Sequence, residues 1–553
     1  MKPYNLTFAI AAAAAGCASS PPVPPVRFAN APPVVAIDDR LDVPAQPESR
    51  EFYVNVYHWD ALLQRRIERG LELPRPQRAL GTNALDEVPD STWFTNRIGV
   101  RDMTIDELTT GPIALDSPEL HKPWTIKSAK PGAGDVGFVV SDTRGAKFLV
   151  KFDPGEYPEQ ETATHVIVDK LLWACGYNTT EDFIVHLRPE DLVIDRDTKI
   201  TDVFGNKHRL ERAELDRRLA TVEHLADGRL RALASRWVDG KPLGGHAAEG
   251  VRSDDRNDRI PHELRRDLRG AFAIFAWLNH VDIQESNFVD SWVADRSDPK
   301  IHYVKHYLLD FGKSLGVMAT TGHDPRRGHS YVIDLADMTT SLFQLGLVER
   351  SWEDTSAPKL RGVGLFEAHT YNPGTWVTDY PVYVPFLRAD RIDQFWGAKI
   401  LIRFTPEQIR AIVDTGQLSD PRAAAYVTET LIARQRATAA YWFARVNPLD
   451  RFEAYRERLC FDDLAIGYDF AAAATTRYQV ERFDRSARSL GSTAAPASSD
   501  GRACVPLSLT GDRDGYTMVK LTTTRPGFEA ATVVHVARDP GSGAPRVIGI
   551  WRL

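Results

Sequence analysis

Two short polar segments, each preceded by an apolar run, constrain this chain more than any other feature. Residues 278–288 read LNHVDIQESNF and place Asn287 five positions after Asp282, while residues 307–312 read YLLDFG and contain Asp310. Side-chain oxygens of Asp and Asn suit hard cations such as Mg²⁺, and an Asp beside them can orient a hydroxyl group for phosphoryl transfer. The two segments can act together only if the chain between them returns as a hairpin.

A long amphipathic helix is predicted directly before the first segment. Residues 261–279 begin with Pro261, which suits a first helical turn, and carry apolar side chains at helical spacing. This helix would deliver the chain from a rigid support to His280 and Asp282. We take these two residues as candidate catalytic groups.

A glycine-rich hairpin is predicted further upstream, within residues 124–151. Its turn contains Gly132, Gly134 and Gly137 in the pattern G-x-G-x-x-G-x-V. Glycines allow backbone N–H groups to approach phosphate oxygens that a side chain would block. A dinucleotide-binding unit would continue with a helix. Here a second strand follows instead, and a third strand ends at Lys151.

Taken in order, these segments resemble the protein-kinase superfamily over about residues 124–451. The order is a glycine-rich hairpin, a strand lysine, a helix, a hinge, an apolar helix, D-x-x-x-x-N and D-F-G. The spacing around Asn279–Asp282 and the missing A-P-E signature indicate the atypical branch, which includes bacterial persistence-toxin and spore-coat kinases. The resemblance implies an α+β, two-lobe fold, with an N-lobe at 124–240 and a helical C-lobe at 241–455.

The resemblance also implies roles for individual residues. Lys151 would contact the α- and β-phosphates of ATP as part of the catalytic set, and Asp282 would orient the acceptor hydroxyl for in-line transfer. Asn287 and Asp310 would bind Mg²⁺ or Mn²⁺. The phosphates would be covered by Gly132, Gly134 and Gly137.

Two features of the nucleotide site stay open at this level. Glu161 is our candidate partner for Lys151, although a solvated acid in the first turn of a helix explains it equally well, and His165 lies nearer the usual separation but is not acidic. Backbone groups around Trp237 and Val238 would meet the adenine edge if this segment is a hinge. An ordinary strand and turn is the other interpretation.

One departure from the kinase pattern leaves a missing positive charge. Gln284 stands where protein kinases usually carry a Lys, two residues after the catalytic Asp. The charge of the transition state would need another donor, for which Arg326 or Arg327 is a candidate.

The N-terminal 17 residues resemble a bacterial lipoprotein signal peptide. An apolar run at residues 6–15 precedes Cys17, which would be lipidated and anchor the chain to a membrane. Ala14 stands where such signals usually carry Leu, so a plain secretory signal is the alternative. Ala18 and Ser19, which directly follow Cys17, are not acidic. This predicts the outer membrane, at its periplasmic or cell-surface face. Residues 18–47 are rich in Pro and Ala and predict an extended tether.

Two further regions flank the kinase-like part. Residues 48–123 predict an N-terminal α+β extension, and residues 456–553 predict a small β-rich domain. Cys460 and Cys504, both in the β-rich domain, could form a disulfide in an oxidising compartment, but a single pair has no spacing pattern to support it.

These observations leave three classes of function. The first is an atypical kinase that transfers the γ-phosphoryl group of ATP to an envelope acceptor, most readily a protein hydroxyl. The second is a kinase-fold binding or scaffold lipoprotein with little catalysis, and the third is an adhesion protein that uses the β-rich domain. The first class is favoured because the chain keeps all four polar residues of the predicted site, Lys151, Asp282, Asn287 and Asp310, and a scaffold needs none of them. The net charge of −7 over 553 residues gives no reason to expect a nucleic-acid partner.

Overall fold

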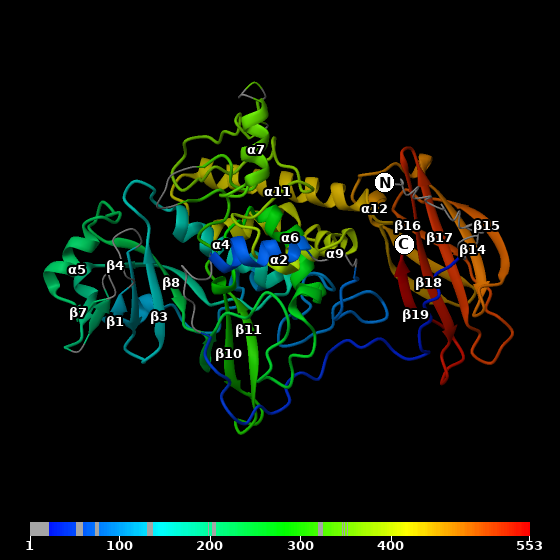
Figure 1. The fold of residues 1–553 in the computed structure, drawn as a ribbon, viewed down its shortest axis with the longest axis horizontal. Coiled ribbons are helices and arrows are strands. Elements are labelled where there is room, and N and C mark those ends of the chain that lie inside the picture. Colours follow the sequence, from blue (N-terminus) through cyan, green and yellow to red (C-terminus); the bar gives the residue numbers. More distant parts are fainter. Residues whose placement is uncertain are drawn as a thin grey trace, which may run out of the picture.

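The structure is a computed structural model that describes residues 22–50, 59–71, 77–129, 136–196, 198–201, 206–318, 324–344, 347, 349–350 and 352–553. Helices and sheets are mixed, which confirms the predicted α+β class. Figure 1 shows a sheet-rich part at one end, a helical part in the middle and a second β-rich part at the other end. Among the described residues, no helix is long and apolar enough to cross a membrane.

A six-stranded sheet, on the left of Figure 1, has the strand order β4-β8-β3-β2-β1-β5. Its neighbours are antiparallel, except that β5 pairs in parallel with β1. Alternate side chains such as Phe138, Phe148 and Val150 are buried on one core. The strands are β1 (Trp124–Ala129), β2 (Gly137–Ser141), β3 (Lys147–Phe152), β4 (Asp182–Leu187), β5 (Leu192–Ile194) and β8 (Leu230–Arg236). A hairpin of β6 (Lys199–Thr201) and β7 (Lys207–Arg209) and helix α5 (Arg212–Leu219) lie beside this sheet.

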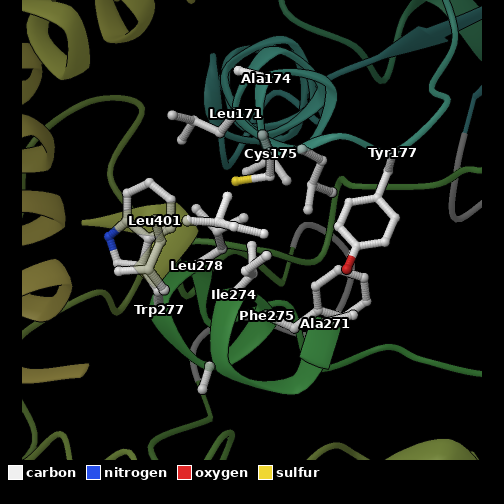
Figure 2. Close-up of a cluster of buried hydrophobic side chains, with 14 of the residues drawn as sticks. Leu171, Ala174, Cys175, Tyr177, Ala271, Ile274, Phe275, Trp277, Leu278 and Leu401 are labelled. Carbon is white, nitrogen blue, oxygen red and sulfur yellow. The ribbon is translucent and has the colours of Figure 1, made fainter. Parts of the chain in front are cut away.

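The helical part is built around α6, which lies against α8, α9 and α11. Figure 2 shows Leu171 and Cys175 of α4 facing Ile274 and Leu278 of α6 in a fully buried core. A three-stranded sheet, β11-β10-β9, adjoins these helices. The elements are α4 (Gln160–Cys175), α6 (Arg266–Leu278), α9 (Arg391–Leu401), α10 (Pro406–Asp414), α11 (Pro421–Phe443), β9 (Lys241–Gly244), β10 (Phe288–Ala294) and β11 (His302–Leu308). Shorter helices are α2 (Arg65–Leu71), α3 (Ile105–Thr110), α7 (Leu335–Gln344) and α8 (Val384–Arg388).

The C-terminal part contains two antiparallel sheets. One has the order β12-β13-β16 and the other β15-β14-β17-β18-β19. Cys460 and Cys504 face each other across β13 and β16 and form a disulfide. The strands are β12 (Leu449–Tyr455), β13 (Arg458–Asp463), β14 (Arg477–Asp484), β15 (Ser489–Pro496), β16 (Arg502–Pro506), β17 (Thr517–Arg525), β18 (Phe528–Arg538) and β19 (Pro545–Arg552), with the short helix α12 (Leu464–Gly467) after β13.

The described part of the predicted tether packs against the body of the protein. Val23 is buried in the core of the larger C-terminal sheet, and Phe28 lies edge-on to the ring of His535. Further along, the Ile37 N–H donates to the Asp90 carbonyl over 2.8 Å, and the Val43 N–H donates to the His302 carbonyl over 2.7 Å. Residues 22–43 therefore join the C-terminal sheet to the helical part.

Candidate functional site

Lys151 occupies a central position in the six-stranded sheet. On β3 it lies opposite Gly137 of β2 and Leu233 of β8, and only 6 % of its surface is exposed. Its Nζ is 2.6 Å from Asp310 Oδ1 and 3.5 Å from Glu161 Oε1. The predicted contact between Lys151 and Glu161 is therefore present.

The other candidate partner of Lys151 is engaged elsewhere. His165 Nδ1 is 2.6 Å from Asp182 Oδ2, and both side chains are buried. Burial would raise the pKa of Asp182, but the charge of His165 and hydrogen bonds from neighbouring hydroxyl groups hold it below its usual value. This pair fixes α4 to β4 and leaves Glu161 as the acid that faces Lys151.

Asp153 ties the lysine strand to the glutamate helix. Its Oδ1 accepts the backbone N–H groups of Glu161 and Thr162 over 2.8 and 3.1 Å at the start of α4. A carboxylate that accepts the first N–H groups of a helix fixes where the helix begins. Because Asp153 is two residues after Lys151, this cap sets the position of Glu161 relative to the lysine. Sequence reasoning missed Asp153.

The segment Asp310–Gly312 packs directly against α4. The Phe311 ring is fully buried, with its centre 5.2 Å from that of His165. A Cβ atom on Gly312 would lie 2.6 Å from Glu161 Cγ, so only glycine allows this approach. Asp310 adopts a left-handed backbone with φ of 60°, a conformation that residues other than glycine adopt rarely and that Asp tolerates better than most.

The loop that follows α6 places Asp282 and Asn287 beside this segment. Asn279 ends α6 in a left-handed conformation with φ of 48°. The Asn287 Nδ2 group donates to the Asp282 carbonyl, and the Asn287 carbonyl accepts the N–H of Leu309 over 2.9 Å. Leu309 directly precedes Asp310. A chain of direct contacts thus brings together the four residues on which the prediction depended, Lys151, Asp282, Asn287 and Asp310.

Lys313 places a positive charge beside Asp282, near Gln284, where the sequence lacks the usual Lys. Its Nζ is 2.7 Å from Asp282 Oδ2, and the Asp282 residue is only 5 % exposed. Burial lowers the pKa of Lys313, but the nearby Asp282 carboxylate more than reverses this, so the pKa is raised. The residues that we proposed instead bind other acids, since Arg326 pairs with Asp324 at 2.9 Å and Arg327 pairs with the buried Asp379.

His280, the other candidate catalytic group beside Asp282, is buried. It is 1 % exposed, and its Nδ1 lies 2.8 Å from the Ser314 hydroxyl. Burial lowers the pKa of His280 to about 4, which keeps the ring neutral at ordinary pH. Its ring packs edge-on against Phe275 of α6. His280 therefore packs between α6 and Ser314, and its catalytic role stays a prediction.

One backbone donor of the predicted hinge, that of Trp237, is used within the protein. The Trp237 N–H donates to the Lys147 carbonyl over 2.9 Å, which extends the pairing of β8 with β3, so this donor is not available to an adenine ring. The side chains of Trp237 and Val238 line a cavity of about 270 Å³ whose lining includes neither Lys151 nor Asp310. Gly132, Gly134 and Cys17 lie outside the described residues.

The site combines three carboxylates with two ammonium groups. The acids are Glu161, Asp282 and Asp310, and the bases are Lys151 and Lys313. Mg²⁺ and Mn²⁺ are usually bound by one or two protein carboxylates together with phosphate oxygens and water. The oxygen atoms of Asp310 and Asn287 fit that requirement, so the donor set is chemically suited to such an ion.

Comparison with known proteins adds little to this geometry. No protein-family model matches the sequence, and no curated protein matches it. Among solved structures, the chain is similar to the crystal structure of the Golgi casein kinase with Mn and ADP bound. The identity is 10 % and the TM-score is 0.29, over 61 % of this chain and 74 % of that chain. A likeness this weak carries no argument about the fold or the activity of this protein.

Proposed function

We propose that this protein is an ATP-dependent phosphotransferase with a two-lobe, kinase-like fold that uses Mg²⁺ or Mn²⁺. The observation that carries the proposal is the shared ammonium of Lys151, which lies 3.5 Å from Glu161 and 2.6 Å from Asp310, on segments far apart in the sequence. The loop that holds Asp282 and Asn287 contacts the residue before Asp310. A scaffold has no need for these polar groups to converge, whereas phosphoryl transfer needs all of them.

Each group has a distinct part in the proposed transfer. Lys151, oriented by Glu161, positions the α- and β-phosphates. Asp310 and Asn287 hold the divalent cation, which neutralises charge on the phosphate oxygens when it is bound. Asp282 accepts the proton of the acceptor hydroxyl as the new oxygen–phosphorus bond forms and the bond between the γ-phosphorus and the ADP oxygen breaks. Lys313 keeps the Asp282 carboxylate in place through the 2.7 Å contact.

The proposed setting is the bacterial envelope, with a protein hydroxyl as acceptor. The pattern that ends at Cys17 supports a lipid anchor, and the disulfide between Cys460 and Cys504 fits an oxidising compartment. Val23, six residues after Cys17, is buried in the C-terminal sheet, so an anchor at Cys17 would hold that sheet close to the membrane. Replacing Cys17 by Ser should release the protein from the membrane fraction.

One experiment separates a kinase from a scaffold. Titration calorimetry with ATP and Mg²⁺, together with transfer of labelled phosphate from γ-labelled ATP, is measured for wild type and for Lys151→Met and Asp310→Ala. We expect wild type to bind and to transfer, and both variants to lose transfer. Lys147→Met is the matched control, because Lys147 is exposed on the same strand. No response of wild type to the nucleotide would favour the scaffold, and binding without transfer would indicate a pseudokinase.

A further inference from the structure

A second cavity lies away from the proposed catalytic groups and carries an excess of positive charge. Its volume is about 270 Å³, and it is enclosed by the segment between α4 and β4, the end of β8, and the β10–β11 hairpin that extends from the lower side in Figure 1. Its charged lining residues are Arg97, Arg236, Arg296, Lys305, Glu181 and Asp239. Four bases thus face two acids.

Both acids are already used by one arginine. Arg236 Nη1 pairs with Glu181, and Arg236 Nη2 lies 2.8 Å from Asp239 Oδ1. Arg97 donates to the carbonyl groups of Trp173 and Tyr177 over 2.7 and 3.2 Å. Three bases, Arg97, Arg296 and Lys305, are therefore left without compensation from these two acids, and Arg97 is held by the two carbonyl groups.

Of these three bases, Lys305 and Arg296 are the two that we consider as ligands for an anion. Within the part of the chain that the structure describes, no carboxylate lies within 4.0 Å of the charged nitrogen atoms of either side chain. Lys305 projects from β11, half-buried, with its Nζ 4.9 Å from the centre of the Tyr307 ring. Burial, followed by the charges of Arg296 and Arg97, lowers the pKa of Lys305 to about 8. The surroundings of Lys305 thus destabilise its charged form, and an anion bound in the cavity would stabilise it.

The remaining lining indicates what kind of anion would fit. Trp173, Trp237 and Tyr307 line the cavity and carry aromatic rings. Asn178 and Thr180 also line it, but the Asn178 amide donates to the carbonyls of Thr92 and His306, and the Thr180 hydroxyl donates to Asp182. A phosphate group pairs well with lysine and arginine together. The volume exceeds that of an inorganic phosphate ion and leaves space for an organic part next to the rings. We propose that this cavity binds a small phosphomonoester, with Lys305 and Arg296 as its cationic ligands and the aromatic rings against its organic part.

The test uses the full chain and two probes. Phenyl phosphate represents the phosphomonoester, and inorganic phosphate represents the anion without an organic part, each titrated by calorimetry at low ionic strength. We expect phenyl phosphate to bind at least tenfold more tightly than phosphate. Lys305→Met and Arg296→Ala should each weaken it about tenfold or more, while Lys300→Met, at the exposed tip of the same hairpin, should not. Arg296 is itself exposed, so its replacement leaves the fold intact.

The pH dependence gives a second readout that a purely structural role would not produce. The groups that face Lys305 are Arg40, Arg97, Arg236, Arg296, Glu181, Asp239 and Tyr307. Burial raises the pKa of Tyr307 above its usual value, so Lys305 is the group that changes charge near pH 8. A phosphomonoester is already a dianion there. The affinity of wild type for phenyl phosphate should fall as pH rises through about 8. Lys305→Arg should keep its affinity for phenyl phosphate at pH 9, because arginine stays charged.

Three results would overturn the proposal. They are no saturable binding of either probe to wild type, equal affinity for the two probes, and unchanged affinity in both Lys305→Met and Arg296→Ala. The site is independent of the proposed phosphotransferase, so Asp310→Ala should still bind phenyl phosphate even though it cannot transfer phosphate. Failure of one assignment therefore leaves the other standing.

Discussion

Replacing Lys151 and Glu161, singly and together, measures whether the ion pair between β3 and α4 has the strength that its geometry implies. Coulomb's law with an effective dielectric constant of about 20 gives about 5 kcal/mol for unit charges at the 3.5 Å between Lys151 Nζ and Glu161 Oε1. Two effects reduce this value. Asp310 shares the same ammonium at 2.6 Å, and burying the partners costs solvation energy. We therefore expect a coupling free energy of about 1–2 kcal/mol in a double-mutant cycle.

The single variants should differ in a defined order. Lys151→Met leaves two carboxylates without their shared cation and should lower the local free energy of opening by about 3 kcal/mol, whereas Glu161→Gln keeps the Asp310 contact and should cost about 1 kcal/mol. Amide hydrogen exchange of the first turn of α4, followed by mass spectrometry, reports this opening directly. Lys147→Met should change it by less than about 0.5 kcal/mol. Additive single effects, with no coupling beyond error, would refute the pairing.

Three further predictions concern separate parts of the molecule. Lys313→Met should slow phosphoryl transfer roughly 100-fold, because the Asp282 carboxylate is no longer held in place. Lys313→Arg should retain most of the rate. An equal loss of rate in Arg326→Ala would contradict the role proposed for Lys313. Burial, followed by Arg27, lowers the pKa of His535 to about 3. Below about pH 6.5, His535 therefore binds a proton in the unfolded chain but not in the folded chain. The C-terminal sheets should be most stable above that pH and lose about 2–3 kcal/mol by pH 4.5, a slope that thermal denaturation of His535→Phe should lack. Replacing both Cys460 and Cys504 by Ser removes a disulfide that joins positions 44 residues apart, and should destabilise the same sheets by about 2–4 kcal/mol. Calorimetry should show a lower unfolding temperature for these sheets and an unchanged one for the helical part.

The order of the elements could be read from hydrophobic periodicity, but their ends could not. The helix predicted over residues 261–279 begins at Arg266, because residues 262–264 form a 3₁₀ turn and Arg265 has an extended backbone. The apolar spacing continues through this break, so the sequence pattern alone does not reveal it. The C-terminal end was closer to prediction, since Asn279, which tolerates the left-handed conformation, ends the helix there.

Some residues of the candidate site could be predicted from a local sequence pattern, and others could not. Asp282, Asn287 and Asp310 stand at fixed spacings that the sequence displays. Asp153 and Lys313 do not, because each acts on a group that only the folded chain brings near: the start of α4 for Asp153 and the Asp282 carboxylate for Lys313. Burial is likewise visible only in the structure, since His280, which the sequence places beside Asp282, is 1 % exposed.

The segment Asp310–Gly312 also explains why the two halves of the site cannot move independently. Asp310 contacts Lys151, Phe311 is buried beside His165, and Gly312 lies so close to Glu161 that a Cβ atom would be 2.6 Å from its Cγ. Tightly packed interfaces of this kind have discrete arrangements and do not deform continuously. A shift of this segment toward α4 would therefore displace Glu161 from Lys151. In the proposed phosphotransferase, the positions of Asp310 and Lys151 would therefore change together.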